Sequence, residues 1–378
     1  MYTSNLREAP SRADRFISGD LMPSFDDIFS AVGKSLKADP GCAVKASSDI
    51  TLSSRIPYGI PTGIPELELA IGRPGIPAGR ITEFYGFERS GKTTAALHVL
   101  ASAQRMGGGG MYIDSESTWD PERAAQLGVD PDKNLAIGEV ENIEGIFRLL
   151  MTTLDTLATI KLGLPFVIIV DSITGVESEI NDDSKKFGKE ARIGQDARLI
   201  RRGVRLVNKK IAGTKTAAIF INHAISNVDG KPWSPKSQAA GGRALKLFST
   251  LRVQFTQGGE IQDDPTKPGV IRLRHGQISR LKVEKLKGSK LMFQSLELSL
   301  LDDGGFDTDA SLLKAGVQSG WITQPDAKSY VLGEHNFPKA DWKAVINSMG
   351  GRVPAYEAWL KWSLANDVLS PWNNWNGI

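Results

Sequence analysis

Short strand-like runs alternate with stretches of helical periodicity along the middle of the chain. The strand-like runs are rich in β-branched and aromatic residues and cover residues 80–85, 166–171 and 217–222. Between them, apolar residues recur every three or four positions across residues 92–105, 143–157 and 193–207. Such alternation is typical of a parallel sheet with helices on both faces. The pattern therefore predicts an α/β fold with a mostly parallel, twisted sheet.

This main domain is expected to occupy residues 56–305. Four consecutive glycines at 107–110 predict a loose turn before a strand at 111–114. The strand at 217–222 is expected to end in His223, and strand-like patterning resumes over residues 272–301.

The first 55 residues are expected to stand apart from the main domain. Residues 1–23 are polar and broken by proline and glycine, which predicts a flexible arm. Residues 24–55 contain a helical apolar pattern behind a capping serine, then a short apolar segment around Val44 and a polar link. Because a helix and a short strand are too small to fold alone, we expect them to pack elsewhere. They dock either on a neighbouring copy of the protein, through Val44, or on their own chain.

Residues 306–378 are expected to form a small C-terminal α/β lobe. Six of the eight tryptophans lie there, namely Trp321, Trp342, Trp359, Trp362, Trp372 and Trp375. A lobe of this size has little else to bury, so large aromatic side chains predict its core. A nucleic-acid role for them is the weaker alternative.

Composition excludes several classes of protein. Of the 378 residues, 40% are hydrophobic and 24% charged, with a net charge of +3, as in an ordinary globular protein. The single cysteine, Cys42, cannot form an internal disulfide, and no cluster has the spacing of metal ligands. No apolar run reaches the length of a membrane span, and the N-terminus does not resemble a signal peptide. We therefore expect a cytoplasmic protein without a membrane partner.

One nine-residue stretch carries the strongest chemical signal. It consists of Gly86, Phe87, Glu88, Arg89, Ser90, Gly91, Lys92, Thr93 and Thr94 and matches the phosphate-loop pattern G-x-x-x-x-G-K-[ST]. Its glycines allow backbone N–H groups to point at phosphate oxygens, while Lys92 reaches the β- and γ-phosphates and Thr93 holds Mg²⁺. A strand before it and a helix after it give the context that this motif requires. The sequence therefore predicts a site for ATP and Mg²⁺.

Two acidic residues and one histidine follow neighbouring strands. Asp171 ends a buried strand and is the expected second Mg²⁺ ligand, because such sheets bind ligands at the carboxyl ends of their strands. Glu116 follows the strand at 111–114 and is the candidate for orienting the attacking water. His223 either simply ends its strand or senses the γ-phosphate. Both interpretations stay open here.

The region from 185 to 210 is strongly basic. It contains ten Lys or Arg residues against two acidic ones, and its apolar positions have helical spacing. The basic side chains that we expect to contact DNA include Arg192, Arg198, Arg201 and Arg202. A polar loop at 226–240 adds Lys231, Trp233 and Lys236. A basic groove with a stacking aromatic suits single-stranded DNA, although a charge run is often only a solvated helix face.

Six motifs in order resemble the RecA family of recombinases, over roughly residues 24–335. They are Ile60-Pro61-Thr62-Gly63, the segment 79–94, Ile113-Asp114-Ser115-Glu116 with Asp120-Pro121, the segment 167–172, Phe220-Ile221-Asn222, and Gly241-Gly242-Arg243-Ala244-Leu245-Lys246. The resemblance implies a RecA-like P-loop ATPase that forms head-to-tail helical filaments of itself on single-stranded DNA. It further implies pairing and strand exchange with double-stranded DNA, and work alongside loader or single-strand-binding proteins.

The resemblance also implies roles for individual residues. Lys92 and Thr93 bind phosphate and Mg²⁺, Glu116 activates water, and Asp171 is the Walker B residue. Further residues take their roles only from the family: Asp120 contacts adenine, Lys285 and Lys287 reach the ATP of the neighbouring subunit, and Gly241, Gly242 and Arg243 contact DNA. The first DNA loop falls within 179–192 and the second within 226–240.

Two positions depart from the family pattern. Bacterial RecA has glutamine at the position of His223, and the exchange to histidine resembles some phage-encoded relatives. Arg123 replaces the tyrosine that stacks on adenine in the family. The acidic tail of bacterial RecA is missing as well, so a phage or plasmid origin is expected. Two alternatives from other classes stay open: a ring helicase on the same core, and a nucleotide-gated regulator of recombination without turnover.

Overall fold

The computed structural model describes residues 56–179, 188–226, 237–240, 242–262, 273–287 and 295–372. Side chains are described for all of these except residues 188–193, 226, 237 and 238. The N-terminal segment around Val44 lies outside this part. In the part that is described, no helix is long and apolar enough to cross a membrane.

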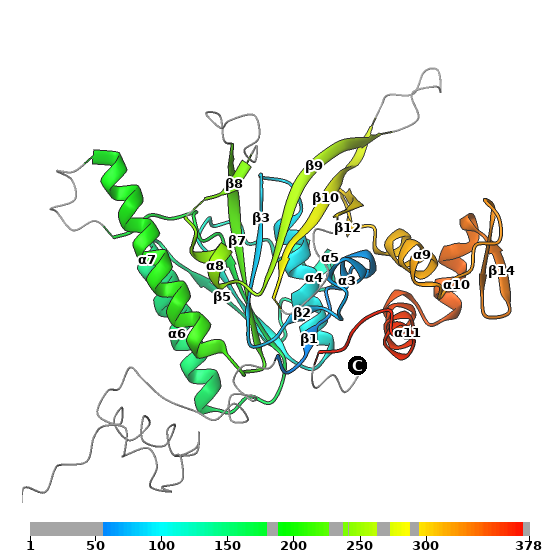
Figure 1. Cartoon of the computed structure of the whole chain (residues 1–378), viewed down its shortest axis with the longest axis horizontal. Coiled ribbons are helices and arrows are strands. Elements are labelled where there is room, and N and C mark those ends of the chain that lie inside the picture. Colours follow the sequence, from blue (N-terminus) through cyan, green and yellow to red (C-terminus); the bar gives the residue numbers. More distant parts are fainter. Residues whose placement is uncertain are drawn as a thin grey trace, which may run out of the picture. The chain divides into compact units, whose positions relative to one another are not determined.

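A ten-stranded sheet forms the centre of the described chain (Figure 1). Its order is β12 (Gly305–Phe306), β11 (Ser295–Leu301), β10 (Arg274–Leu286), β9 (Leu251–Gln262), β3 (Ile81–Gly86), β7 (Thr216–Ser226), β6 (Phe166–Asp171), β4 (Gly109–Asp114) and β5 (Leu135–Glu139), with β8 (Ser237–Ala239) beside β7. The strands from β9 to β5 are parallel, and the remaining pairs are antiparallel. The prediction of an α/β fold with a mostly parallel sheet is therefore confirmed.

The central strands are buried on both faces. In β6, Val167 and Ile169 join one hydrophobic core, whereas Ile168 and Val170 join the other. Successive side chains of a strand point to opposite faces, so a continuous β-branched run is what two buried faces require.

Helices cover the two faces. The first core includes residues of α3 (Pro65–Ile71), α4 (Lys92–Arg105) and α5 (Pro121–Gln126), and the small hairpin of β1 (Gly59–Ile60) and β2 (Ile76–Pro77) lies beside it. The second includes residues of α6 (Ile143–Thr159), α7 (Gly188–Ile211) and α8 (Ala244–Phe248). Figure 1 shows α6 and α7 together on one side of the sheet and α3 and α4 on the other. The carboxyl ends of the parallel strands β3, β4, β6 and β7 lie at the same edge of the sheet, where residues that follow them can meet.

The C-terminal lobe has its own core. It contains α9 (Thr308–Ser319), β13 (Ser329–Leu332), β14 (His335–Pro338), η3 (Lys339–Asp341), α10 (Trp342–Ser348) and α11 (Arg352–Ala365). Trp342 and Trp359 are buried in this core, as expected. Trp372 is not: it belongs to the core of the main domain, where its Nε1 donates to Pro74 O over 2.9 Å. The expected division between residues 305 and 306 stays a prediction.

Two local expectations were wrong. Of the four glycines, only Gly107 has open space around it, with φ of 80°. A Cβ on Gly108 would lie 1.9 Å from Pro165 O, and one on Gly109 would lie 2.2 Å from Asn134 O. These glycines thus permit close packing rather than a loose turn. Strand β7 also continues past His223 to Ser226, because it pairs with β8.

Candidate active site

The phosphate loop connects β3 to α4. A Cβ on Gly86 would lie 2.0 Å from Phe255 O of the neighbouring strand, and Gly91 has φ of 95°, so both positions favour glycine. Three consecutive loop carbonyls accept hydrogen bonds from side chains of β9 and β10. Gln257 donates to Glu88 O over 3.0 Å, Gln277 to Arg89 O, and Ser279 to Ser90 O over 2.6 Å.

These bonds orient the loop amides. In a trans peptide the N–H points opposite to the preceding C=O. Because the three carbonyls face β9 and β10, the N–H groups of Arg89, Ser90 and Gly91 face the other way. Such a row of N–H groups binds anions. The sequence motif did not reveal the three side chains that hold it.

Lys92 and Thr93 open helix α4. The Lys92 ammonium donates to Phe87 O over 2.7 Å and is 5% exposed. Burial lowers the pKa of Lys92, and the nearby carboxylates of Asp171 and Glu116 oppose this effect. A positive charge is thus held at the phosphate loop.

Thr93 is joined to Asp171. Its Oγ1 donates to Asp171 Oδ2 over 2.7 Å, and the Tyr112 hydroxyl donates to the same atom over 2.7 Å. Burial raises the pKa of Asp171, and these hydrogen bonds limit the rise. Among the described residues, no group of three or more His, Cys, Asp or Glu could hold a metal ion. A hydroxyl and one carboxylate fit Mg²⁺, which commonly takes few protein ligands beside phosphate oxygens.

Glu116 is positioned by the chain that follows β4. Asp114 accepts the backbone N–H groups of Glu116, Thr118 and Trp119 at 2.8 to 3.0 Å. Ser172 Oγ donates to Glu116 Oε1 over 2.5 Å, and His223 Nε2 lies 2.9 Å from the same oxygen. The bond from His223 is the main reason why the pKa of Glu116 lies below its usual range, although partial burial opposes it. Glu116 is therefore held as a carboxylate.

A cavity of about 500 Å³ adjoins the phosphate loop. Its lining residues are Arg89, Ser90, Gly91, Lys92, Thr93, Thr94, Arg123, Arg274, Gln277, Leu300, Leu301 and Asp302. Arg123 Nη1 donates to Asp302 O over 3.0 Å. Asp120 does not line this cavity. Its carboxylate instead accepts Arg123 N–H over 3.0 Å and caps α5.

Lys285 and Lys287 do not line the cavity either. Lys285 is paired with Arg252, three residues before Phe255 and thus about 10 Å down the sheet from the start of the phosphate loop. Its ammonium donates to Lys246 O and Leu247 O at 2.5 and 3.0 Å, at the end of α8. Burial, with the charge of Lys287, lowers the pKa of Lys285 to about 8.

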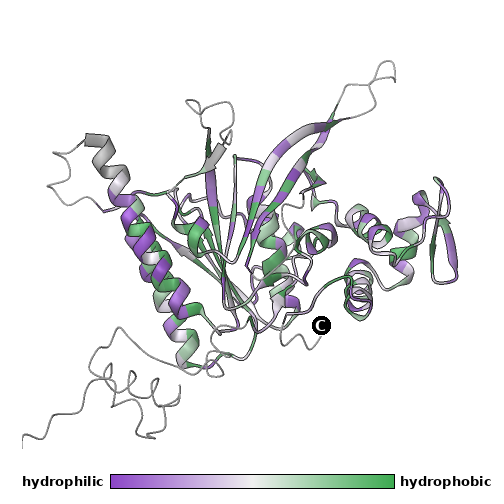
Figure 2. Cartoon of the chain, in the orientation of Figure 1, coloured by the Kyte–Doolittle hydropathy of each residue, from purple (hydrophilic) through white to green (hydrophobic). Residues whose placement is uncertain are grey.

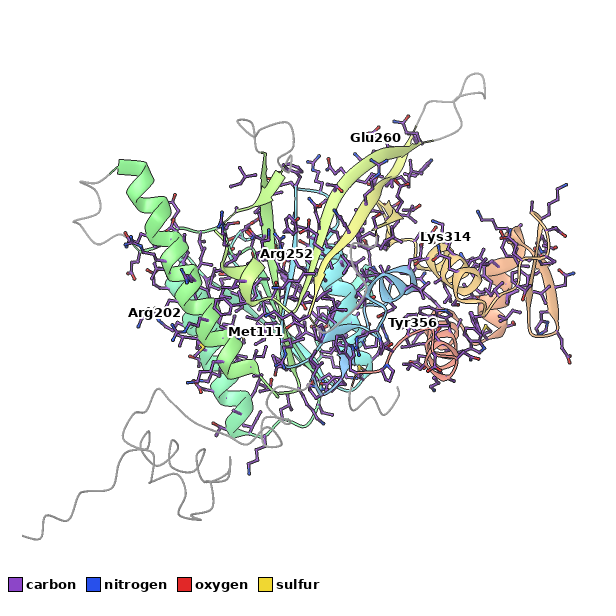
Figure 3. All side chains as sticks on the ribbon, viewed as in Figure 1. Met111, Arg202, Arg252, Glu260, Lys314 and Tyr356 are labelled. Carbon is purple, nitrogen blue, oxygen red and sulfur yellow. The ribbon has the colours of Figure 1, made fainter. Side chains whose placement is uncertain are left out.

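The candidate DNA-binding residues fall into two groups. Arg198, Arg201 and Arg202 are exposed on α7, and Figure 3 shows Arg202 on the side away from the sheet. Figure 2 shows hydrophilic residues repeated along this helix. Exposed Gly242 and Arg243 precede α8, and a Cβ on Gly242 would lie 3.4 Å from Ala197 of α7, next to Arg198. Lys231, Trp233, Lys236 and Gly241 lie outside the described residues, as does the Arg192 side chain.

Comparison with known proteins gives the family. A model of the RecA N-terminal domain matches residues 50–306. The chain belongs to the RecA family. The RecA protein of Aquifex pyrophilus is 34% identical over 277 residues, 73% of this chain and 74% of that protein. The RecA protein of Acidothermus cellulolyticus is 35% identical over 274 residues, covering 71% and 72%. The phage or plasmid origin stays a prediction.

Proposed function

We propose that the protein is an ATP-dependent DNA recombinase, which forms helical filaments on single-stranded DNA and catalyses homologous pairing and strand exchange. One observation carries the proposal. The carboxylate of Glu116, beside the phosphate loop, contacts His223, and the backbone carbonyl of His223 accepts Ala240 N–H over 2.8 Å. The chain leaves the candidate DNA loop along β8, which pairs with β7, and Ala240 follows β8 directly. His223 would therefore contact both the group that hydrolyses ATP and the end of the segment that binds DNA.

Phosphate binding follows from charge and backbone geometry. Lys92 offsets the charge of the β- and γ-phosphates, and the loop N–H groups bind their oxygens. Thr93 and Asp171 would hold Mg²⁺, which supplies further neutralisation of the developing negative charge. Arg123 would border the base.

Glu116 is the proposed water-activating base. A base must be unprotonated at working pH, and the hydrogen bonds from His223 and Ser172 favour that state. Ser172 also restricts the direction of the carboxylate. His223 would respond to the γ-phosphate because it contacts the Glu116 carboxylate.

Substitution of two residues separates binding from turnover. Lys92→Ala should abolish nucleotide binding, whereas Glu116→Gln should preserve binding and stop hydrolysis. Binding is measured with a fluorescent ATP analogue and turnover by phosphate release with and without DNA. Lys343→Ala, on the exposed side of α10, is the control. A Glu116→Gln protein that hydrolysed ATP at the parent rate would refute the assignment of the base.

Electron microscopy distinguishes a recombinase from a ring helicase. With single-stranded DNA and a slowly hydrolysed ATP analogue, a recombinase should give helical filaments, since its head-to-tail interface does not close. Closed rings would indicate a helicase instead. Filaments without any DNA-stimulated hydrolysis by the parent would indicate a regulator. A strand-exchange assay with a homologous and a heterologous duplex then tests pairing itself.

A further inference from the structure

A chain of buried polar side chains crosses the sheet beneath the phosphate loop. Arg252 of β9 donates through Nε to Glu83 Oε2 over 2.5 Å and through Nη1 to Glu284 Oε2 over 2.6 Å. Its guanidinium lies 3.9 Å from the ring centre of Tyr85. The side chains of Arg252 and Glu83 are only 6% and 1% exposed. Figure 3 labels Arg252 in the middle of the sheet.

The chain of polar groups ends at Asn222, which is 1% exposed and directly precedes His223. Asn222 Nδ2 donates to Glu83 Oε1 over 3.0 Å and to Ala240 O over 3.1 Å. Both partners can only accept, so the amide must present its NH₂ group to them. Its Oδ1 is buried without a partner among the described residues. The amide is thus oriented entirely through its donors.

Ala240 is consequently held twice. Asn222 binds its carbonyl with a side chain, while His223 binds its N–H through the backbone. The two residues are adjacent in β7, but their side chains make different further contacts. His223 contacts Glu116, whereas Asn222 contacts the Glu83–Arg252 pair. The residue that follows β8 is therefore tied to the active site and to a buried ion pair.

A buried ion pair is not the most stable arrangement for the interior of a sheet. Removing two charges from water often costs more than their attraction returns, and apolar replacements can be as stable. A series of linked buried hydrogen bonds does, however, favour one arrangement of the groups that make them. Glu83 uses Oε2 for Arg252 and Oε1 for Asn222, so the pair determines where the Asn222 amide points.

We propose that Asn222 is a positioning residue that couples DNA binding to ATP hydrolysis by holding Ala240 in register with His223. The Glu83–Arg252 pair acts through Asn222 and keeps its amide directed at Ala240. The proposal rests on the proposed function, because it presupposes that DNA stimulates turnover. It concerns the coupling alone, not the binding of nucleotide or the chemical step.

The test compares DNA stimulation with basal turnover. Asn222→Ala should keep its basal kcat and its KM for ATP within about twofold, but lose about tenfold of its stimulation by single-stranded DNA, a size typical of coupling between sites. Gln104→Ala is the matched control, because that buried amide also donates to two backbone carbonyls, those of Asp130 and Lys133, elsewhere in the main domain. It should leave the stimulation unchanged.

A double-mutant cycle tests the role of the ion pair. Glu83→Gln should reduce the stimulation in the parent but have no further effect in the Asn222→Ala background, since Glu83 acts only by directing the Asn222 amide at Ala240. Additive losses would overturn the claim that the pair acts through Asn222. Should Asn222→Ala fail to fold, judged by circular dichroism, Asn222→Ser replaces it in the cycle. Should both fail, Glu83→Gln decides alone, and unchanged stimulation would overturn the proposal.

The remaining outcomes are distinguishable. Parent-like stimulation of folded Asn222→Ala overturns the inference and leaves the proposed function intact. A parallel fall of basal and stimulated turnover also overturns it, because the residue would then be only structural. A parent protein whose turnover ignores DNA overturns both the inference and the proposed function.

Discussion

His223 Nε2 lies 2.9 Å from Glu116 Oε1, although the two residues are 107 positions apart in the chain. Both side chains are about a third exposed, at 30% and 31%. A carboxylate can only accept, so the imidazole donates through Nε2. The proposed base therefore depends on a residue of the strand that leads into the candidate DNA loop.

The first prediction concerns the acid side of the pH–rate profile. The His223 hydrogen bond is the largest cause of the lowered pKa of Glu116. A carboxylate with a lowered pKa is protonated only at low pH, so His223→Ala should let Glu116 protonate at higher pH. The acid limb of DNA-dependent ATPase activity should then shift upward. Ser172→Ala removes a lesser contribution and should shift the limb less. An acid limb that stays in place in His223→Ala would contradict the role of this bond.

The second prediction concerns DNA affinity. Arg198 is exposed on α7, and Gly242 packs near it. If Arg198 contacts phosphate, Arg198→Ala should weaken binding about equally on unrelated single strands and reduce the salt slope by about 1. Fluorescence anisotropy at several salt concentrations measures both quantities. Lys343→Ala is the control on the distant lobe. A sequence-dependent loss of affinity would instead indicate a contact to bases.

Local patterns predicted much of this fold. The expected helix at 92–105 and the strand at 166–171 are confirmed as α4 (Lys92–Arg105) and β6 (Phe166–Asp171). The first segment has apolar residues at helical spacing and the second is a continuous apolar run that ends in an aspartate, so neighbouring elements do not override them. The glycines at 107–110 failed as a turn because a missing side chain serves flexibility and close packing equally well.

Long-range contacts explain what the sequence could not predict. Gln257 and Ser279 contact loop residues 169 and 189 positions away, through strand pairings that no local motif encodes. Trp372 was expected in the lobe, but the chain returns to the main core near Pro74. Composition cannot tell which of two adjoining cores an aromatic residue fills.

The third prediction concerns nucleotide selectivity. Arg123 lines the cavity beside the phosphate loop and is held there by Asp302 O. A guanidinium that stacks on the base contributes about 0.5 to 1 kcal/mol, or two- to fivefold in affinity. Arg123→Ala should weaken fluorescent ATP and GTP analogues equally, because stacking does not distinguish base edges. Arg148→Ala, exposed on α6, is the control. A loss confined to ATP would mean that Arg123 recognises the edge of adenine.

The fourth prediction concerns the junction between the main domain and the lobe. Glu68 is fully buried and accepts from Tyr356 of α11 over 2.6 Å. Burial raises its pKa from 4.5 to about 7. Because the folded protein binds the Glu68 proton more tightly than the unfolded chain, protonated Glu68 favours the fold fully below about pH 4.5. This contribution is lost as the pH rises to about 7. Relative to Glu68→Gln, the parent should therefore lose on the order of 3 kcal/mol of unfolding free energy across this window.

Urea unfolding at several pH values measures this difference. Tyr356→Phe is the companion variant: it keeps the carboxylate, and because the Tyr356 hydrogen bond lowers the pKa of Glu68, its pH dependence should persist and extend to higher pH. It should lower stability by about 1 kcal/mol through the lost hydrogen bond. A parent and a Glu68→Gln variant with parallel pH profiles would show that Glu68 does not titrate in this range.

The fifth prediction concerns sharing of the active site between subunits. Lys285 and Lys287 lie away from the cavity of their own chain. Lys285 is level with the middle of β3 and Lys287 with its first residue, whereas the phosphate loop follows its last residue. Positive charge supplied in trans can raise phosphoryl transfer by about 10³ to 10⁵. Because the pKa of Lys285 is lowered to about 8, this contribution should decline as the pH rises through that value.

Mixing two inactive proteins tests the trans arrangement directly. Lys285→Ala/Lys287→Ala spoils one surface of a head-to-tail interface, and Glu116→Gln spoils the other. Random co-assembly at equal amounts should then restore activity at about a quarter of the interfaces, because each contact pairs two different surfaces. If the lysines served their own subunit, no pairing of the two variants would complete a site. Filaments shown to contain both proteins, yet without recovered ATPase activity, would therefore exclude action in trans.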